Sequence, residues 1–212
     1  MKKIMFNDKF SLTQAVLEGR KTMTRRIVTY PLKFRGVNVA GYFVCKRPSG
    51  EVTEICMYDE DERMIDGGQI LPKYKVGEVV AIAQSYKDCG NIPDYELDED
   101  GYPIMPKKSG FFNKMFVKAD LMPHHIEITD IKVERLQDIS DEDCMKEGIY
   151  RLDSANGNGG IAYSFVGASD KKHIGLYNTP RDAFSALIDK VSGKGTWESN
   201  PYVWVYEFKL FD

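Results

Sequence analysis

The stretch Tyr202-Val203-Trp204-Val205-Tyr206-Glu207-Phe208-Lys209 has the clearest secondary-structure pattern in the chain. Successive side chains of a β-strand point to opposite faces, so the four aromatic residues of this stretch share one face. The two valines, Glu207 and Lys209 share the other face. The pattern predicts a strand that lies at the centre of a sheet.

Two further segments predict strands of the same sheet. Residues 79–83 form a continuous apolar run after a turn at 74–78, which is typical of a buried strand. The segments 126–128 and 131–133 each alternate apolar and polar residues, but in opposite phase. A β-bulge near Thr129-Asp130 would keep both sets of apolar side chains facing the core. Such bulges are common in small barrels.

Three helices are predicted from their start and stop signals. The first begins with the capping-box sequence Ser11-Leu12-Thr13-Gln14 and ends at Gly19. The second begins at Ser140 and ends just before Gly148, and the third begins at Thr179-Pro180 and ends at Gly193. A few helices among many short strands indicate an α+β protein built on a small barrel or curved sheet.

The 212 residues are expected to form a single domain, 1–212, because no linker or charge block divides them. Three segments are interpreted as insertions in this domain, near 40–73, 86–112 and 151–178. We expect loops and hairpins in the first, where short apolar runs are separated by turn residues, and a long loop in the second, which is polar and contains three prolines. Loops of such length are usually functional or mobile.

Composition limits the classes of function. A net charge of −3 argues against a surface that is basic all over, as in a general duplex-DNA binder. Positive charge is instead concentrated in the segment 20–26, whereas 94–100 and 138–143 are acid-rich. A small anionic or nucleotide ligand fits this distribution better than a long duplex does.

The cysteines, histidines and apolar runs point to a cytoplasmic protein without a membrane span, metal or cofactor. The four cysteines lack CxxC spacing, which favours reduced thiols. The apolar start of the chain is interrupted at Asn7-Asp8-Lys9, and no stretch approaches the ~20 apolar residues of a membrane helix. His124 and His125 are adjacent and would point to opposite faces, which does not suit a shared metal.

The segment 19–26, Gly-Arg-Lys-Thr-Met-Thr-Arg-Arg, carries the residue types most suited to a functional site. In an extended chain, Thr22, Thr24 and Arg26 would share one side, and Lys21 and Arg25 the other. Arginines bind phosphate through paired hydrogen bonds, and a hydroxyl beside a lysine can act as a nucleophile. The alternative interpretation is a solvated basic strand that complements the negative end of the preceding helix.

Glu147 is predicted to end the second helix. A carboxylate is unfavourable at this end of a helix, because the helix dipole is negative there. The position therefore suggests a basic partner that the fold brings to Glu147.

Several motifs occur in the order in which they are found in ASCH domains, and together they span most of the chain. They are the basic segment 19–26, Val76-Gly77-Glu78 before a strand, 134–139 followed by Glu147-Gly148, and Asn200-Pro201 before the final strand. The chain thus resembles the ASCH family. The resemblance implies a PUA-like β-barrel with about three flanking helices, and a cleft lined by the basic segment and Glu147. It also implies binding of RNA or a modified nucleoside, which is our leading hypothesis.

The same resemblance implies an alternative, enzymatic function. A small bacterial member of the family is an amidohydrolase that removes the acetyl group of N4-acetylcytidine with a lysine, a threonine and a glutamate. These roles match Lys21, Thr24 and Glu147, where the threonine oxygen attacks the carbonyl and neighbouring arginines help to depress the lysine pKa. The residues expected to bind the ligand are Arg20, Thr22, Arg25, Arg26, Gln84 and Tyr86.

Tyr86 is the best candidate for stacking on a base, because it follows the strand 79–83 that would border the cleft. A third hypothesis is a protein-interaction module of a mobile element, in which 86–112 or 151–178 is the binding surface.

Overall fold

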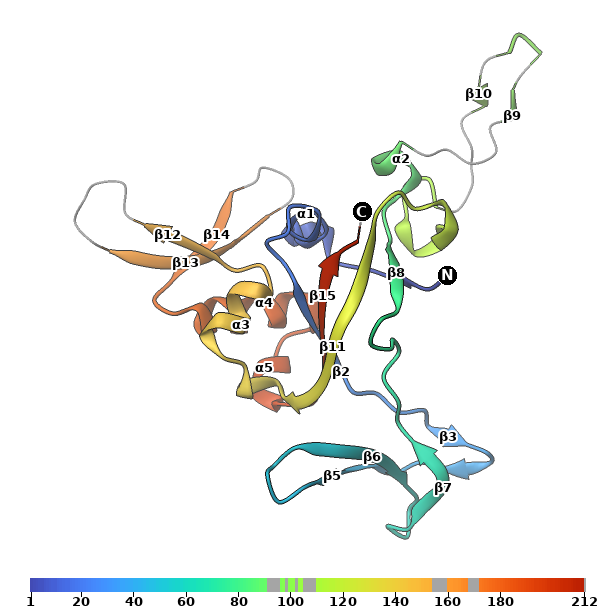
Figure 1. Ribbon diagram of the computed structural model, residues 1–212, viewed down its shortest axis with the longest axis vertical. Helices are drawn as coiled ribbons and strands as arrows, with labels where there is room; N and C mark the ends of the chain where they lie inside the picture. The colour runs from blue at the N-terminus through green and yellow to red at the C-terminus, as the bar shows by residue number, and fades with distance from the viewer. Residues whose placement is uncertain are drawn as a thin grey trace.

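The protein is mixed α+β, and strands predominate in it (Figure 1). The computed structural model describes residues 1–90, 96–97, 99–101, 103–104, 110–153, 160–167 and 172–211. Its central sheet has the strand order β1-β8-β11-β15-β2. These strands are β1 (Lys3–Ile4), β8 (Val79–Ile82), β11 (His125–Arg135), β15 (Tyr202–Leu210) and β2 (Met23–Ile27).

The prediction of a central C-terminal strand is confirmed. β15 lies between β11 and β2 and is antiparallel to both. Side chains on both of its faces are buried, including Val203, Val205 and Tyr206. The predicted bulge is also confirmed, since the register of β11 against β15 shifts between Ile128 and Asp130. Ile126 and Ile128 before the bulge are buried in the main hydrophobic cluster, and Ile131 after it is partly buried and packs against the same cluster.

The sheet does not close into the predicted barrel through the pairings of the described residues, because β1 and β2 remain its two edges. The edges nevertheless approach each other. Arg26 of β2 donates a hydrogen bond from Nη2 to the carbonyl oxygen of Met5, just after β1. β1 has only two residues and offers few backbone groups for strand pairing. The two edges are therefore linked by this side-chain contact and not by backbone hydrogen bonds between β1 and β2.

All three predicted helices are present, as α1 (Leu12–Leu17), α3 (Asp141–Lys146) and α4 (Pro180–Ser192). The caps of the last two are as expected, because Ser140 and Thr179 accept hydrogen bonds from the backbone N–H groups of Asp143 and Asp182. Figure 1 shows α3 and α4 together on one side of the sheet. Two single-turn helices were not predicted, α2 (Tyr86–Cys89) and α5 (Thr196–Ser199).

The capping box predicted for α1 is wrong. Ser11 has a left-handed backbone (φ 53°), and its side chain makes no capping hydrogen bond. A short 3-10 helix, η1 (Asp8–Phe10), precedes it and leads the chain into α1 at this angle. Asp8 instead accepts a hydrogen bond from the Thr13 hydroxyl (2.5 Å). A capping box requires an extended backbone before the helix, whereas the chain enters α1 directly from the 3-10 helix η1.

Two of the segments interpreted as insertions contain small sheets: hairpins were expected in the first, whereas the sheet in the second was not predicted. Residues 33–69 contain β3 (Lys33–Phe34), β4 (Val37–Asn38), β5 (Gly41–Lys46), β6 (Val52–Tyr58) and β7 (Met64–Gln69), of which the last three form one antiparallel sheet. Residues 150–177 contain the antiparallel strands β12 (Tyr150–Asp153), β13 (Ile161–Val166) and β14 (His173–Tyr177). Phe165 of β13 is fully buried in the main core, so this sheet is part of the domain.

The segment 86–112 contains α2 and the short pair β9 (Glu96–Leu97) and β10 (Pro103–Ile104). Parts of the predicted insertions lie outside the described residues, among them Pro93, Pro106, Gly157 and Gly159. Three 3-10 turns complete the described chain, η2 (Lys114–Phe116), η3 (Ala119–Leu121) and η4 (Leu136–Asp138).

None of the described helices is long and apolar enough to cross a membrane. In the same part of the chain, no three His, Cys, Asp or Glu residues are grouped so that they could hold a metal ion.

Candidate functional site

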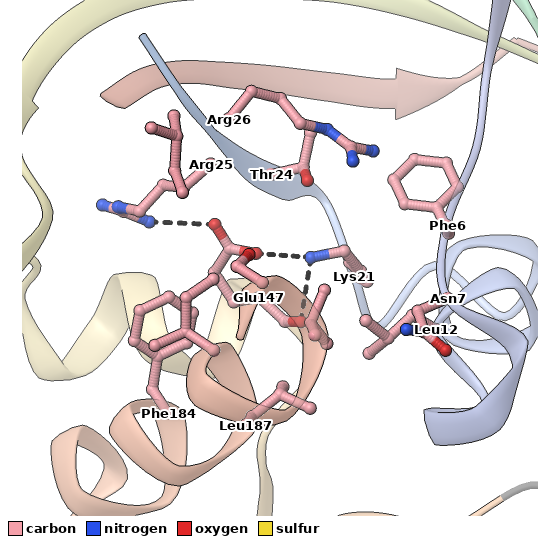
Figure 2. Close-up of a pocket in the computed structure, with 14 residues that line it drawn as sticks. Phe6, Asn7, Leu12, Lys21, Thr24, Arg25, Arg26, Glu147, Phe184 and Leu187 are labelled. Carbon is pink, nitrogen blue, oxygen red and sulfur yellow. Dashed lines mark hydrogen bonds and ion pairs between the residues drawn. The ribbon is translucent and has the colours of Figure 1, made fainter. Parts of the chain in front are cut away.

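A cavity of about 270 Å³ lies between β2, the segment after β1, α1 and α4. Its polar lining includes Lys21, Thr24, Arg26 and Glu147. Five of the residues expected from the sequence to form a site, these four and Arg25, are thus brought together (Figure 2). Apolar side chains of α1, α4 and the segment after β1 complete the wall, namely Phe6, Leu12, Phe184, Leu187, Ile188 and Val191. The volume approaches the lower end of the range for small-molecule sites, roughly 300–1,000 Å³.

Lys21 and Glu147 form a buried ion pair at the base of this cavity. The Lys21 ammonium lies 2.5 Å from Glu147 Oε2 and also donates to the Glu147 carbonyl oxygen at 2.9 Å. The two residues are 2% and 5% exposed. Glu147 is the C-cap of α3, where a carboxylate is unfavourable. Lys21 is the basic partner that this position predicted. Burying the two charges costs hydration, which offsets their attraction, so the pair by itself adds little to the stability of the fold.

Burial lowers the pKa of Lys21 below its ordinary value, since the loss of hydration outweighs the attraction of Glu147. Arg26 and Arg25 lower this pKa further by charge repulsion. The ammonium therefore gives up its proton more readily than a solvated lysine does. A neutral lysine can accept a proton from a neighbouring hydroxyl, which is the property of a general base.

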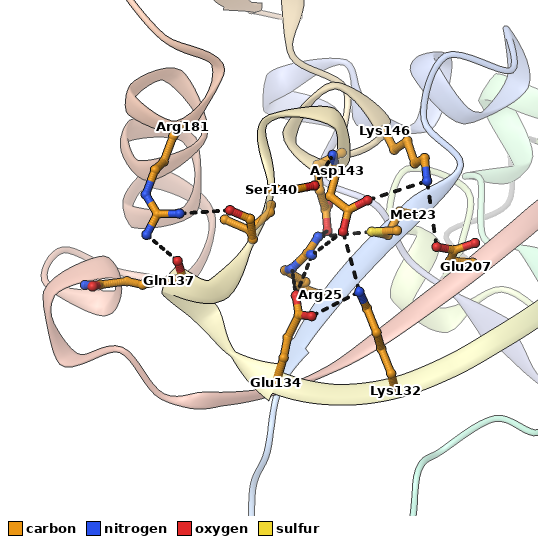
Figure 3. A network of polar contacts seen from close by, with 12 residues as sticks. Met23, Arg25, Lys132, Glu134, Gln137, Ser140, Asp143, Lys146, Arg181 and Glu207 are labelled. Atoms are coloured by element: carbon orange, nitrogen blue, oxygen red, sulfur yellow. Dashed lines mark hydrogen bonds and ion pairs between the residues drawn. The ribbon is translucent and has the colours of Figure 1, made fainter. Parts of the chain in front are cut away.

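Arg25 holds the other oxygen of Glu147 from the opposite side. Its Nη1 lies 3.1 Å from Glu147 Oε1, and its Nη2 lies 2.6 Å from Glu134 Oε1 and 3.1 Å from Asp143 Oδ2. The Arg25 side chain is completely buried. Despite its burial, contacts with Glu147 and Glu134 raise the Arg25 pKa. Figure 3 shows this network, in which Lys132 also contacts Glu134.

Arg25 lines the cavity, but its contacts do not support the prediction that it binds the ligand. Its guanidinium is fully engaged by three carboxylates from β11 and α3. We interpret it as a positioning residue that fixes the orientation of Glu147. Alternation along β2 explains the difference, because Arg25 lies on the face opposite Thr24 and Arg26.

Thr24 presents its hydroxyl to the cavity. It pairs with Tyr206 across β2 and β15, and the residue is 5% exposed. Figure 2 shows the hydroxyl on the cavity side of β2, between Arg26 and Lys21. Lys21 shares this cavity, although strict alternation had predicted it on the other side. The reason is that β2 begins at Met23, so Lys21 precedes the extended segment.

The other predicted ligand residues do not line this cavity. Arg20 lies against Glu18 and over the Tyr150 ring, and the backbone of Thr22 pairs with Lys146 and Phe208. Tyr86 is 6% exposed and packs in a separate hydrophobic cluster, where its hydroxyl accepts a hydrogen bond from the Lys118 N–H. Stacking of a base on Tyr86 is therefore contradicted by its burial.

Gln84 also lies outside the cavity lining. Its side-chain oxygen is buried, and no hydrogen-bond partner for it occurs among the described residues. The structure gives no physical account of this orphaned oxygen.

Sequence reasoning missed Glu134 and Asp143 as partners of the site. Both are acidic residues whose roles depend on the approach of β11 and α3 to β2. The sequence predicted that Phe184 and Leu187 share the apolar face of a helix, but not that they line the cavity. A pattern within one helix cannot show which cavity the face borders.

Gly148 determines how the chain leaves Glu147, and its substitution gives a first prediction. Its φ is +102°, and an added Cβ would lie 3.4 Å from Leu12 Cδ2. We expect Gly148→Ala to lower the free energy of unfolding by roughly 1–3 kcal/mol, since an L-residue is strained at this φ. Urea denaturation measures the change. Gly36→Ala, also at positive φ but with open space around the Cβ, is the control. The Leu12 contact is at an ordinary van der Waals distance, so the two losses should be similar, and a Gly148→Ala variant as stable as the native protein would contradict the prediction.

The chain was compared with known protein families, curated proteins and solved structures. No match was found. The ordered motifs and the geometry of the cavity are therefore the observations that bear on the function of the site.

Proposed function

We propose that the cavity at Lys21, Thr24 and Glu147 is the active site of an amidohydrolase that removes an acyl group from a modified base or nucleoside such as N4-acetylcytidine. The observation that carries the proposal is the buried lysine of lowered pKa in one small cavity with a threonine hydroxyl. Binding a ligand requires only charge and shape. Catalysis also requires a nucleophile and a base that activates it, and a desolvated lysine beside a hydroxyl can supply both.

The first chemical step is attack by threonine. Neutral Lys21 takes the proton of the Thr24 hydroxyl, and the oxygen attacks the acyl carbonyl carbon. Glu147 stabilises the ammonium that forms, because its carboxylate already lies 2.5 Å from Lys21 Nζ. Arg26 lines the cavity beside Thr24 and supplies positive charge near the developing oxyanion.

The second step releases the amine. The bond between the carbonyl carbon and the base nitrogen breaks, and the proton held on Lys21 passes to that nitrogen. Water then hydrolyses the acyl-threonine ester, which releases the carboxylic acid and restores the hydroxyl. The reaction needs neither a metal nor an oxidant.

The lowered pKa of Lys21 predicts how activity depends on pH. Only the neutral lysine acts as a base, so kcat/KM for acyl release should rise with pH through the lowered pKa and level off before the ordinary lysine value of 10.5. Initial rates of acetate release across this range measure the profile. Lys21→Arg keeps the charge but cannot lose its proton, and we expect it to be inactive. A profile that falls with rising pH would contradict the role of Lys21.

The same residue affects stability without any substrate. Within the window between the lowered pKa and 10.5, the unfolded chain holds the proton that folded Lys21 has lost. Unfolding then takes up a proton, so the contribution of Lys21 to the free energy of unfolding rises with pH. Lys21→Met removes this contribution, which urea denaturation at several pH values can detect.

A family relationship is part of the proposal. We infer that the chain is an ASCH protein of PUA-like fold whose barrel is left open between β1 and β2. The ordered motifs support this inference, and the cavity lies where the family resemblance implies a cleft. Binding of RNA or a nucleoside without chemistry is the second candidate, favoured by Arg26 at the cavity. The interaction module of a mobile element stays a hypothesis.

A further inference from the structure

A second cavity, of about 310 Å³, adjoins the first. Arg26 and Ile27 line both cavities, so the two meet at the end of β2. It lies between the two edges of the central sheet, because Lys3 of β1 and Arg26 of β2 both form part of its lining. A ligand that fills the first cavity and continues past Arg26 would therefore enter the second.

The register of β2 against β15 places both cavities along one face of the sheet. Thr24 is opposite Tyr206 and Arg26 is opposite Trp204. Residues paired across an antiparallel ladder point to the same face, so these four side chains follow one another along it. The aromatic rings of Trp204, Tyr206 and Tyr74 line the second cavity. Trp204 is partly exposed there, whereas the two tyrosines are buried.

The lining of the second cavity is cationic. It contains Lys3, Arg26 and Lys73, and no carboxylate occurs among its described lining residues. The Lys3 ammonium is held by the carbonyl oxygens of Met115 and Val117. Arg26 and Lys73 form no ion pair within the described part of the chain. Arg26 donates from Nη2 to the Met5 carbonyl oxygen but has further N–H donors, so these two residues are the cations available to an anion.

The cations also affect one another. Burial lowers the pKa of Lys73, and repulsion by Arg26, Lys2 and Lys3 lowers it further. The backbone of Lys73 is held by a hydrogen bond from its N–H to the Tyr206 hydroxyl at 3.0 Å, and its ammonium lies 5.3 Å from the centre of the Tyr74 ring. Like charges held together without an acid are unfavourable in the free protein, and an anion bound between them would relieve the repulsion.

We propose that the second cavity is a phosphate subsite, so that the substrate carries a phosphate next to the acylated nucleoside. This inference rests on the proposed function, in which the base occupies the first cavity. Arg26 and Lys73 hold the phosphate oxygens, and Trp204 offers a partly exposed ring to the adjoining sugar or base. The phosphate belongs either to a mononucleotide or to the phosphodiester of a single strand.

The subsite gives a role to the segment predicted as an insertion near 40–73. Ile70, Leu71 and Lys73 directly follow β7 and form one wall of the second cavity. A third cavity shares Ile70, Leu71 and Trp204 with the second and reaches β6. The added sheet thus extends the site beyond what a free nucleoside would occupy.

Equilibrium binding tests the subsite independently of catalysis. The affinities of cytidine, its 5′- and 3′-monophosphates and a cytidine dinucleotide are measured by calorimetry at one fixed ionic strength. We expect at least one phosphorylated ligand to bind ~10-fold more tightly than cytidine, as charge-assisted hydrogen bonds to phosphate imply. Lys73→Gln should bring this ratio close to one. The matched control Lys75→Gln, two residues away and outside the cavity lining, should preserve it.

The outcomes separate the inference from the proposed function. Preference for a monophosphate identifies a mononucleotide substrate, and preference for the dinucleotide alone identifies a strand. Equal affinities for all four ligands, or a ratio that Lys73→Gln leaves intact, overturn the phosphate subsite. Acetate release from N4-acetylcytidine, measured in parallel, decides whether the proposed function fails as well.

Discussion

Thr24→Ala is expected to lower the rate of acetate release from N4-acetylcytidine by roughly 10⁴- to 10⁶-fold, as removal of a nucleophile does in other acyl-transfer enzymes. The physical reason is that the alanine methyl group cannot form the ester through which the acyl group passes. Because Thr24 lies at the surface of the cavity rather than in the charged network, folding should be little affected. Single-turnover kinetics at saturating substrate measure the chemical step directly.

Thr22→Ala is the matched control for this variant. Thr22 is a threonine of the same basic segment, but it does not line the cavity. We expect it to retain most of the activity. Thr24→Ser, which keeps the hydroxyl, should retain a measurable part. If Thr24→Ala hydrolysed the substrate as fast as the native protein, water rather than Thr24 would be the nucleophile.

Arg25→Met is expected to lower the free energy of unfolding by about 3–5 kcal/mol, the usual cost of removing one partner from a buried ionic network. The variant leaves Glu134, Asp143 and Glu147 close together without the guanidinium that holds them at 2.6–3.1 Å. Lys21 and Lys132 would remain as partners and limit the loss. Chemical denaturation monitored by tryptophan fluorescence measures it.

Arg20→Met is the control for Arg25→Met. Arg20 is also an arginine paired with a glutamate, but its side chain is 31% exposed, and we expect a change within about 1 kcal/mol. Should Arg25→Met fail to fold, Glu134→Gln removes one charge from the same network, and its loss in the free energy of unfolding measures the contribution of that charge. A loss at Arg25 no larger than that at Arg20 would show that the network does not stabilise the fold.

The sequence was most informative where a local pattern had a single structural solution. The alternation of 202–209 predicted the central strand, and the opposite phases on either side of Thr129 predicted the bulge in β11. The caps at Ser140 and Thr179 likewise depend on residues close in sequence. Each of these features is determined within a few residues of the chain.

Features that depend on distant segments were predicted poorly. Arg25 and Arg26 are adjacent and chemically alike, and both line the cavity, yet the Arg25 guanidinium is paired with carboxylates whereas that of Arg26 contacts the Met5 carbonyl oxygen. Their difference arises from which face of β2 meets α3. Hairpins were expected near 33–69, but the sheet at 150–177 was missed because its glycine-rich sequence has few apolar positions and resembles a loop.

The central claim is that the cavity releases the acyl group of an acylated nucleoside, and its most direct test is product analysis. Purified protein is incubated with N4-acetylcytidine, and acetate and cytidine are measured together by chromatography, with Lys21→Ala and Thr24→Ala in parallel. We predict equal amounts of the two products from the native chain and none above background from either variant. No acetate from the native chain, or the same amount from all three proteins, would contradict the assignment of Lys21 and Thr24 to catalysis.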